Sequence, residues 1–423
     1  MGLYMKKDFI PVLLGSDQNV YGMARSFHME YGCVSEAIGR GALPATSDSK
    51  IVKVVISEPD LEDDEVFVKT LVGYAREKAK GEDAGVPLLL VSCGDNYTKL
   101  LARNGDRIKD YFRFVCPTEE IYDRLSIKEN FYQVCRENGF DFPRTEVCTY
   151  ENRAELELPF DFPVVVKPSN SVAYWNCTFP GKKKVFVIKS AEELKAVLEA
   201  IYSSSYKDDI ILQEFIPGED NMMRVVNCYC AKNDTTGNRV RLFAVGNVLL
   251  EEHTAQGIGS YAAIIPGKDD GLKKRITDFL NAVGYTGFIN IDIKLDRRDG
   301  KYKFFEMNLR QGRSSFFVTA AGCNLAKFLV DDLIYGKEYG TVSPEPDSCL
   351  WSVIPEKVIM KFVHDEELKA KAERLIKEKK FVRQLYYAPD MGFARTKMFV
   401  LNQANYMRKY NRNFGRKGYF DDK

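Results

Sequence analysis

Two strands joined by a tight turn are predicted between residues 286 and 312, and no other segment constrains the fold as strongly. The segment reads TGFINIDIKLDRRDGKYKFFEMNLRQG, and its Asp299-Gly300 pair is a recognised hairpin signal between apolar runs. Pairing of the two strands places Asp292 opposite Glu306. Two carboxylates would then face each other with Cβ atoms about 5 Å apart, which is normally destabilising. We therefore expect cations close to this pair.

The predicted register depends on the length of the hairpin loop. If residues 297–301 form the loop, Asp296 pairs with Tyr302, and counting back along both strands brings Asp292 opposite Glu306. Side chains alternate between the two faces of a strand, so one face is polar and the other is apolar. The polar face also carries Asn290, Lys294 and Asn308, and the apolar face carries Ile289, Ile291, Ile293, Phe305 and Met307.

The chemistry of the polar face favours magnesium. Mg²⁺ binds a few carboxylates together with phosphate oxygens and water, without histidine or cysteine. The chain has three histidines, His28, His253 and His364, which lie too far apart in the sequence to indicate a histidine-rich zinc site. In the alternative hypothesis, Lys294 or Arg310 neutralises the two carboxylates on a solvated face of the sheet.

The composition excludes several classes of protein. A length of 423 residues provides for about two to four domains, and 61 basic against 60 acidic residues leave no net field for bulk nucleic-acid binding. No apolar run approaches a membrane span of about 18 residues, and the run after the first lysines is too short for a signal peptide. The ten cysteines include no CxxC pair and are interpreted as buried free thiols. We expect a cytoplasmic protein without a transmembrane segment.

Strands and helices alternate over the first 117 residues. This rhythm is typical of a parallel sheet with crossover helices, in which ligands gather at the carboxyl ends of the strands. The loops at residues 15–19 and 93–96 follow two such strands, and we expect them to bind ligands. The predicted strands are 9–15, 50–57 and 86–94, and the predicted helices are 19–32 and 65–81.

The pattern changes near residue 118, where helices begin to alternate with hairpins. We expect an N-terminal parallel α/β domain over 1–117, a mixed α+β domain over 118–340 and a C-terminal extension over 341–423. Within the extension, a short strand is predicted near IMKFV at 359–363, and a charged helix is predicted over 364–380.

Two lysines are placed where phosphate groups could bind. Ser126 and Glu129 have the spacing of a capping box, so Lys128 is expected in the first turn of a helix. A helix N-terminus favours phosphate and a lysine adds charge there, although a surface lysine in a first turn is common. Lys167 follows the buried strand 164–166, and a lysine in that position costs desolvation unless an anion receives it.

A third segment, DDIILQEFIPGEDNMM, is suited to hold a purine. An apolar strand runs into residues 213–216, after which Pro217-Gly218 turns the chain towards two acids. Backbone groups after the strand can hydrogen-bond a base, and Glu219 or Asp220 can accept from ribose hydroxyls. The chain contains no GxxxxGK[ST] loop and no protein-kinase signature, so those two ways of binding a nucleotide are excluded.

The order of these segments resembles the ATP-grasp superfamily. Lys128, the VVVKP strand, QEFIPGED, IDIKLD and FEMNLR follow one another within residues 118–335. The resemblance implies ATP and two Mg²⁺ ions held between two α+β subdomains, beside an N-terminal parallel-sheet (pre-ATP-grasp) domain. It implies these contacts: Lys128, Lys167 and Ser169 with phosphates; Gln213, Glu214, Phe215 and Ile216 with adenine; Asp220 with ribose; Asp292, Glu306 and Asn308 with magnesium; and Arg310 and Arg313 as catalytic residues, with Arg310 near the transferred phosphoryl group.

One segment departs from the superfamily. The loop after Lys167 usually carries several glycines that cover the phosphates, but here it reads SNSVAYWNCTFPGKKK. Ser169, Asn170 and Ser171 are expected to donate instead, and the lysines at 182–184 are expected to close over the site. The departure motivates one alternative of a different class, a nucleotide-binding protein that no longer catalyses.

The N-terminal segment LLGSDQNVYGMARSF, with the overall length and the tail, resembles the D-aspartate ligases of bacterial cell-wall synthesis. The resemblance implies an ATP-dependent carboxylate-amine ligase: the β-carboxylate of D-aspartate becomes an acyl phosphate, which the lysine side-chain amine of a nucleotide-linked peptidoglycan precursor attacks. The expected substrate residues are Asp17, Asn19, Tyr21 and Arg25. Tyr21 and Arg25 share a helix face, and Arg25 either clamps a substrate carboxylate or pairs with a local acid. A different amino-acid, peptide or carboxylate-thiol ligase is the second hypothesis.

The C-terminal tail is basic, with no acid between Met391 and Phe420. Aromatic and aliphatic residues interleave with its cations. Two hypotheses remain open: a basic amphipathic helix that contacts a membrane surface or a diphosphate-bearing precursor, and a solvated helix packed on the catalytic domain. The cations are Arg395, Lys397, Arg408, Lys409, Arg412, Arg416 and Lys417, and the interleaved residues are Phe399, Val400, Tyr406 and Tyr410.

Overall fold

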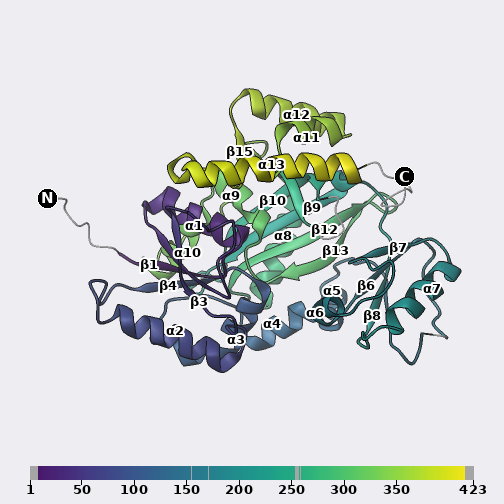
Figure 1. The fold of residues 1–423 in the computed structure, drawn as a ribbon, viewed down its shortest axis with the longest axis horizontal. Coiled ribbons are helices and arrows are strands. Elements are labelled where there is room, and N and C mark those ends of the chain that lie inside the picture. The colour runs from purple at the N-terminus through teal and green to yellow at the C-terminus, as the bar shows by residue number, and fades with distance from the viewer. Residues whose placement is uncertain (1–7, 154, 170, 253–256, 258, 415–423) are drawn as a thin grey trace.

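The computed structural model describes residues 8–153, 155–169, 171–252, 257 and 259–414 of the chain. Three sheets organise these residues: two of four strands and one of seven (Figure 1). The mixture of parallel and antiparallel sheets with helices is the α/β and α+β class that the sequence predicts.

The N-terminal sheet has the strand order β3-β2-β1-β4, and all of its strand pairs are parallel. The three strands and two helices that we predicted in this region are present. The structure also contains strand β2 and helix α3, which we did not predict. The strand was missed because it has only five residues and Glu36 interrupts its apolar pattern. The elements are β1 (Ile10–Leu14), α1 (Gln18–Tyr31), β2 (Ser35–Gly39), β3 (Val52–Ser57), α2 (Asp64–Lys78), β4 (Leu88–Ser92) and α3 (Asp95–Ile108).

A second, antiparallel sheet follows in the order β5-β8-β6-β7. Figure 1 shows it as a separate layer at the lower right, next to the β12–β13 hairpin of the larger sheet. Its elements are β5 (Thr145–Cys148), β6 (Val164–Pro168), α6 (Ser171–Asn176), β7 (Phe186–Ile188), α7 (Ala191–Tyr202) and β8 (Ile210–Glu214), preceded by α4 (Glu119–Ser126) and α5 (Lys128–Glu137).

The seven-stranded sheet has the order β13-β12-β9-β10-β11-β14-β15. Its last two strands come from beyond residue 340, so the C-terminal extension continues the central sheet; the domain boundaries themselves stay a prediction. The elements are β9 (Met223–Cys230), β10 (Val240–Glu251), β11 (Tyr261–Gly267), α8 (Asp270–Ala282), β12 (Gly287–Asp296), β13 (Lys301–Asn308), α9 (Phe316–Ala320), α10 (Leu325–Leu333), β14 (Leu350–Ser352) and β15 (Phe381–Arg383).

The β12–β13 hairpin confirms the predicted pair of carboxylates by a different register. Asp296 pairs with Lys301 and not with Tyr302, so the loop is one residue shorter than predicted. A β-bulge then leaves Phe305 without a partner, and this extra residue restores the pairing of Asp292 with Glu306. The bulge also explains why Phe304 is fully buried while Phe305 is only partly buried.

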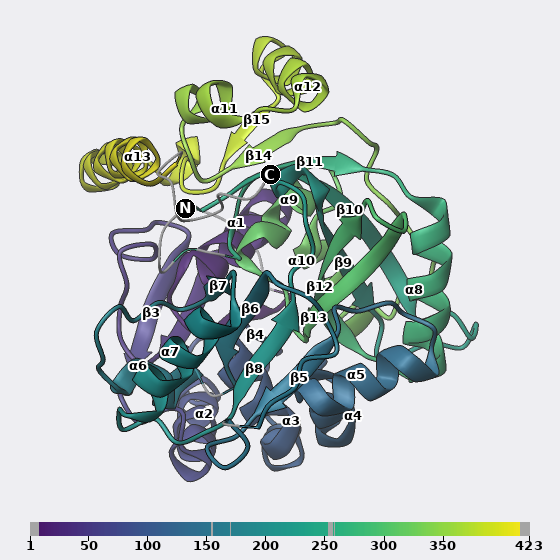
Figure 2. The same cartoon turned by 90° about the vertical axis from the view of Figure 1, so that its right-hand side faces the viewer.

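The C-terminal extension contains three helices, α11 (Glu356–Phe362), α12 (Glu366–Lys377) and α13 (Phe393–Asn413). The charged helix predicted over 364–380 is confirmed as α12. The strand predicted at IMKFV is wrong, because Ile359, Phe362 and Val363 are buried at helical spacing on α11 and just after it. Figure 2 shows α13 end-on at the upper left, beside α11 and on the outside of the molecule.

One side of α13 packs on the body of the molecule, and this packing agrees with the second hypothesis for the tail. Arg395, Phe399, Tyr406 and Tyr410 are buried there. Arg416 and Lys417 lie outside the described residues. No helix in the described ranges has the length and apolar character needed to span a membrane. The ten cysteines are free thiols, and all except Cys33 and Cys116 are buried, as predicted.

Candidate active site

Asp292 on β12 and Glu306 on β13 form a carboxyl pair. The hydroxyl of Tyr261 donates to Asp292 Oδ1 at 2.8 Å, and Asn308 Nδ2 donates to Asp292 Oδ2 at 3.1 Å. Burial and the neighbouring charge of Glu306 raise the pKa of Asp292 well above its ordinary value. A proton therefore stays on this pair to higher pH than on an isolated aspartate, unless a cation takes its place.

Glu306 is the ionised member of the pair. Desolvation opposes its ionisation, but the charges of Lys167 and Lys128 outweigh this effect and lower the pKa of Glu306. Solvent still reaches the Glu306 side chain, although protein surrounds it closely enough for desolvation to matter. Both predicted phosphate-binding lysines therefore lie close enough to Glu306 for their charges to set its protonation.

Lys167, near the end of β6, is the most strongly perturbed of the site lysines. Desolvation and the positive charge of Lys128 lower the pKa of Lys167 to about 7. Its ammonium donates to Gln213 Oε1 at 3.1 Å, and Gln213 in turn donates to the hydroxyls of Tyr132 and Thr145. Gln213 is buried and positions Lys167 in the structure, and its contact with adenine stays a prediction.

Lys128 begins helix α5, as predicted, but the predicted capping box is wrong. Ser126 is the last residue of α4, and Ile127 is the residue before α5, without a side-chain cap. Two helices therefore meet where one was expected, because Ile127 adopts an extended backbone between them. Desolvation lowers the pKa of Lys128, although the charge of Glu306 opposes the shift.

The chain after β8 offers backbone groups to a base. The Glu214 carboxylate is neutralised by Arg144 at 3.1 Å and by Arg298 at 2.8 Å, so its side chain is already paired. Ile216 is buried, and the Phe215 ring lies 5.7 Å from Lys294 Nζ. An adenine contact at Glu214 and Ile216 would thus use the backbone, as the sequence resemblance implies.

Lys294 and Asp220 flank the same segment. The Lys294 ammonium donates to the carbonyls of Ile216 and Gly218 at 2.9 and 2.7 Å, and burial lowers its pKa. Lys294 therefore fixes the turn after β8 and does not neutralise the carboxyl pair, which removes one form of the alternative hypothesis. Asp220 follows the turn and accepts from the backbone N–H of Glu251 at 2.9 Å.

Arg310 and Arg313 follow β13, and both are engaged by acids. Arg310 Nη2 lies 2.7 Å from Asp95 Oδ2 at the start of α3, and its charge also acts on Asp292 and Glu306. Arg310 therefore connects the carboxyl pair to the N-terminal sheet, and it contributes to neutralising that pair, as the alternative hypothesis proposed. Further along, Arg313 pairs with Glu252 and donates to the Tyr261 carbonyl at 2.8 Å.

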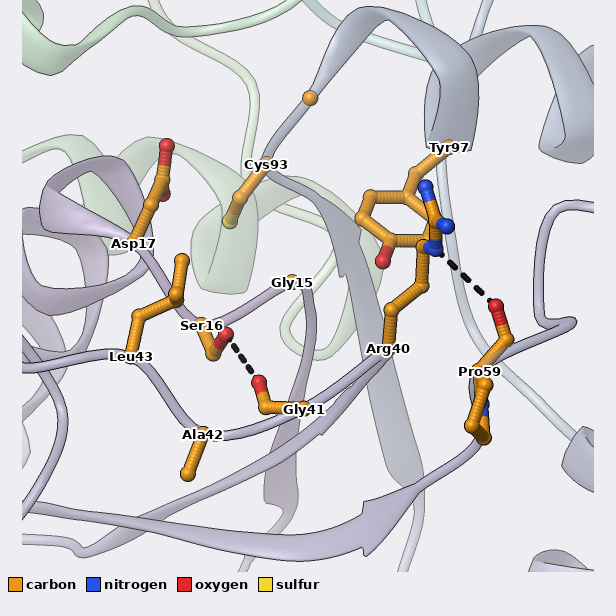
Figure 3. Close-up of a pocket in the computed structure, with 11 residues that line it drawn as sticks. Gly15, Ser16, Asp17, Arg40, Gly41, Ala42, Leu43, Pro59, Cys93 and Tyr97 are labelled. Carbon is orange, nitrogen blue, oxygen red and sulfur yellow. Dashed lines mark hydrogen bonds between the residues drawn. The ribbon is translucent and has the colours of Figure 1, made fainter.

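A cavity of about 470 Å³ opens at the carboxyl ends of the N-terminal strands (Figure 3). The predicted ligand loops after β1 and β4 contribute to it. The Arg40 guanidinium lies on one side, where its Nε donates to the Pro59 carbonyl at 3.0 Å. Gly15 has a φ of 114°, which lets the chain turn sharply from β1 into the cavity wall. The lining residues are Gly15, Ser16, Asp17, Arg40, Gly41, Ala42, Leu43, Pro59, Cys93, Gly94 and Tyr97.

Asp17 links this cavity to the residues after β13. It caps helix α1 by accepting from the backbone N–H groups of Asn19 and Val20 at 3.0 and 3.2 Å. Desolvation raises the pKa of Asp17, and the charges of Arg310 and Arg313 act in the opposite direction. Asp17, which lines the cavity, is therefore close enough to both predicted catalytic arginines to be affected by their charges.

The other three predicted substrate residues have protein partners in the structure. Asn19 is buried and donates to the carbonyls of Cys93 and Gln311 at 2.9 and 2.8 Å. Arg25 is buried between the rings of Phe316 and Tyr387, and it donates to the Arg383 and Gln384 carbonyls. The clamp expected at Arg25 is replaced by packing against the C-terminal extension. Tyr21 donates to Asp390 Oδ2 at 2.9 Å in the same interface.

The glycine-poor loop after β6 shows only part of its expected contacts. Ser169 is exposed, and its backbone N–H donates to the Asp209 carbonyl at 3.0 Å. Asn170 lies outside the described residues. Lys182 bonds to the Cys177 carbonyl, and Lys183 lies 5.8 Å from the Phe186 ring, so both contact their own subdomain. Closure of these lysines over the site stays a prediction.

The residues around the carboxyl pair fit a magnesium ion that carries phosphates. Asp292, Glu306 and Asn308 supply oxygen atoms only, which is the chemistry that Mg²⁺ prefers. In the ranges that the structure describes, no group of three or more His, Cys, Asp and Glu side chains could hold a metal by itself. The two carboxylates and the amide would therefore need phosphate oxygens and water to complete the coordination.

Sequence reasoning missed Tyr261 and Asp95 as partners of site residues. Tyr261 comes from β11, which is not a neighbour of β12 in the sheet, so no strand pattern could have linked it to Asp292. Asp95 was part of a loop that we expected to bind ligands, but its pairing with Arg310 had no local signal. Both contacts arise from the way distant segments meet.

No protein-family model matches the chain. The chain is 39% identical over 419 residues to the D-aspartate ligase of Enterococcus faecium, an alignment that covers 96% of this chain and 97% of that protein. It also resembles solved structures at low identity. One is an L-amino acid ligase from Bacillus licheniformis, with a TM-score of 0.53, 14% identity, and coverage of 78% of this chain and 75% of that one.

A second solved structure contains a bound nucleotide. It is the biotin carboxylase domain of the 2-oxoglutarate carboxylase from Hydrogenobacter thermophilus, in complex with MgADP, ADP and bicarbonate. The TM-score is 0.54 and the identity is 15%, with coverage of 78% of this chain and 70% of that one. The overall fold is therefore the one that the sequence resemblance implies.

Proposed function

The chain belongs to the D-aspartate ligase family, and from this premise we propose that it joins the β-carboxylate of D-aspartate to the lysine side-chain amine of a peptidoglycan precursor. It is an ATP-dependent ligase with the ATP-grasp fold, and it forms an amide bond. The choice of D-aspartate and of the acceptor is the part of the proposal that goes beyond family membership.

One observation carries the proposal: the charges of Lys128, Lys167 and Arg310 all act on Glu306, and that of Arg310 also acts on Asp292. A substrate carboxylate and the γ-phosphate of ATP repel each other, so the site must neutralise several negative charges before they can approach. Three cations beside two metal-binding carboxylates provide that neutralisation. This arrangement supports phosphoryl transfer without a nucleophilic side chain.

The reaction has two steps whose atoms and charges balance. A carboxylate oxygen attacks the γ-phosphorus of ATP, and the bond to the β-phosphate oxygen breaks to give an acyl phosphate and ADP. The acceptor amine then attacks the acyl carbon, phosphate leaves, and one proton is released as the amide forms. Lys128 and Lys167 bind the phosphates, and Arg310 stabilises charge on the transferred group.

Asp292, Glu306 and Asn308 would hold magnesium, and we propose two ions, as the superfamily resemblance implies, with phosphate oxygens and water completing the coordination. When bound, magnesium supplies positive charge that polarises the phosphoryl oxygens. The remaining residues orient these ligands. Tyr261 fixes Asp292 Oδ1 through a 2.8 Å hydrogen bond, so the carboxylate keeps its direction when it loses its proton.

We propose that the amino-acid substrate binds beside Asp17. D-aspartate carries one ammonium and two carboxylates, and Asp17 is an acid close to the charges of Arg310 and Arg313. In this proposal Asp17 receives the ammonium group, while Arg310 faces the reacting carboxylate. The 470 Å³ cavity beyond Asp17 provides room for the acceptor amine and the chain that carries it. Because ATP is the energy source, the reaction is placed in the cytoplasm.

The test is an ADP-release assay across a panel of amino acids, followed by mass measurement of the product. We expect release with D-aspartate and a lysine-containing nucleotide-linked peptidoglycan precursor, and a product heavier by one aspartyl residue. Release with D-glutamate, D-alanine or L-amino acids in place of D-aspartate would support a different ligase of the family. No release with any pair would support a nucleotide-binding protein that does not catalyse.

A further inference from the structure

Helix α13 has a second side that the ligase reaction does not use. Its inner side is anchored to the domain by buried residues such as Arg395, which pairs with Asp390 at 2.9 Å. Its outer side exposes large apolar side chains: Phe393 is 90% exposed, Leu401 60% and Val400 57%. An exposed phenylalanine and two exposed aliphatic residues on one rigid helix are costly in water.

The exposed apolar residues form a row along the helix. Phe393, Val400 and Met407 recur every seven residues, so they lie nearly in line, and Met407 is also exposed. Leu401 stands on the adjoining line of the helix. This row runs over most of the length of α13, so its exposed apolar side chains share one side of the helix.

A row of cations runs beside the apolar row. Lys397, Arg408 and Arg412 are exposed and share the line on which Leu401 stands. Helix α13 contains no acid at all, although the whole chain is nearly neutral, with 61 basic and 60 acidic residues. The outer side is therefore a local concentration of positive charge, and no acid on its own helix neutralises it.

We propose that the outer side of α13 binds the surface of an anionic membrane. An apolar row flanked by Lys and Arg is the pattern of a helix that lies in the plane of the interface, with its apolar side chains among the acyl chains and its cations at the headgroups. A second copy of this chain would bring the same cations against each other, so charge disfavours self-association. Nucleic acid would satisfy the cations and leave Phe393 and Val400 in water.

The position of α13 is suited to this role. Both Figure 1 and Figure 2 show the helix on the outside of the molecule, on the side opposite α2 and α3. The buried Arg395–Asp390 pair fixes the helix to the domain, so binding through α13 would orient the whole enzyme. The inference does not depend on the ligase reaction, because it uses no residue of the candidate active site.

Vesicle co-sedimentation of the full chain tests the proposal. We expect the protein to sediment with vesicles rich in phosphatidylglycerol and to stay in solution with pure phosphatidylcholine, and we expect high salt to release it. Replacing Lys397, Arg408 and Arg412 together by Gln should lower the partition coefficient of the protein between vesicles and water on the order of a hundredfold, because each cation contributes a factor of about five. Replacing Phe393, Val400 and Leu401 by Ser should also release the protein.

A charge-matched control uses three exposed lysines on the opposite side: Lys69 on α2, Lys80 just after α2, and Lys99 on α3. Their replacement by Gln changes the net charge equally and should leave vesicle binding intact. Thermal unfolding of each variant shows whether the fold is kept. The proposal is overturned if the wild-type protein does not sediment with phosphatidylglycerol vesicles. It is also overturned if the control variant weakens vesicle binding as much as the variant that lacks Lys397, Arg408 and Arg412.

Two further outcomes would identify another occupant. If the variant with Ser at positions 393, 400 and 401 binds vesicles as well as the wild type, only the cations attract the membrane. Insertion of the apolar row into the membrane would then be contradicted. If analytical ultracentrifugation of the wild type shows a dimer that Phe393→Ser dissociates, the outer side of α13 is an interface between copies of the chain.

Discussion

Asp292 and Glu306 face each other across β12 and β13, and the unpaired Phe305 beside them is what keeps them in register. Without that bulge the shorter hairpin loop would move Glu306 out of line with Asp292 and turn it to the other face of the sheet. The candidate metal site therefore depends on one extra residue in β13.

Glu306→Gln should fold normally and lose magnesium-dependent ADP formation. The substitution keeps the size of the side chain but removes the ionised member of the pair, whose charge Lys167 and Lys128 favour, so we expect a small loss of stability with the fold kept. We expect the turnover rate to drop on the order of a hundredfold or more, as for other groups that stabilise a transition state. Glu199→Gln, on the exposed side of α7, is the matched control. Ordinary turnover in Glu306→Gln would falsify the metal assignment.

The affinity for ADP without magnesium should fall as pH rises above about 7. In the free protein, burial and Lys128 hold the pKa of Lys167 at about 7. Phosphate groups favour the charged ammonium, so nucleotide binding must take up a proton wherever free Lys167 is neutral. The slope can reach about tenfold per pH unit.

Titration of ADP at several pH values measures this slope, and Lys167→Met provides the comparison. The variant should bind ADP more weakly and lose most of the pH dependence above about 7. An unchanged slope in Lys167→Met would assign the proton to another group. The free energy of unfolding should change with pH in the opposite direction to the ADP affinity. Lys167 has its ordinary, higher pKa in the unfolded state, so that state binds the proton more readily than the folded one. The wild type should therefore become more stable as pH rises from about 7 towards the ordinary pKa of lysine.

Arg310→Gln should lower the turnover rate about a hundredfold to a thousandfold while ADP affinity changes little. Arg310 acts on the transferred phosphoryl group in our proposal, and its contribution is made mainly in the transition state. Arg310→Lys should recover part of the rate, since it keeps the charge and loses the fork that binds Asp95. Arg103→Gln, an exposed arginine of α3 that pairs with Glu119, is the control. A fall in ADP affinity equal to the fall in rate would place Arg310 in ground-state binding instead.

Asp390→Ala should lower the free energy of unfolding by about 3–5 kcal/mol, because it leaves the charge of Arg395 buried without its partner. The same carboxylate also accepts from Tyr21 Oη and Ser49 Oγ, so the N-terminal domain loses contacts with the extension. Urea unfolding measures the change. Glu77→Ala breaks an exposed pair with Lys80 and should cost less than about 1 kcal/mol. A similar small cost for Asp390→Ala would show that the extension does not depend on this pair.

The candidate site was predictable where a local pattern carried the information. Alternation along β12 and β13 predicted the carboxyl pair, and the apolar run before Lys167 predicted a buried lysine next to an anion. The same reasoning failed at Ser126, where a capping-box spacing occurs at the junction of two helices. It failed again at Arg25, because its position on a helix face does not say which distant segment covers that face.

By itself, the sequence determined the β12–β13 hairpin, the face that carries Asp292 and Glu306, and the need for cations near this pair. Only the tertiary structure decided which distant groups meet: Tyr21 bonds to Asp390 across 369 residues of chain, and Tyr261 reaches Asp292 from a strand that is not its neighbour. The physical reason is that periodicity reports the face on which a side chain lies. The partner on that face is set by the free energy of packing remote segments, which no local pattern contains.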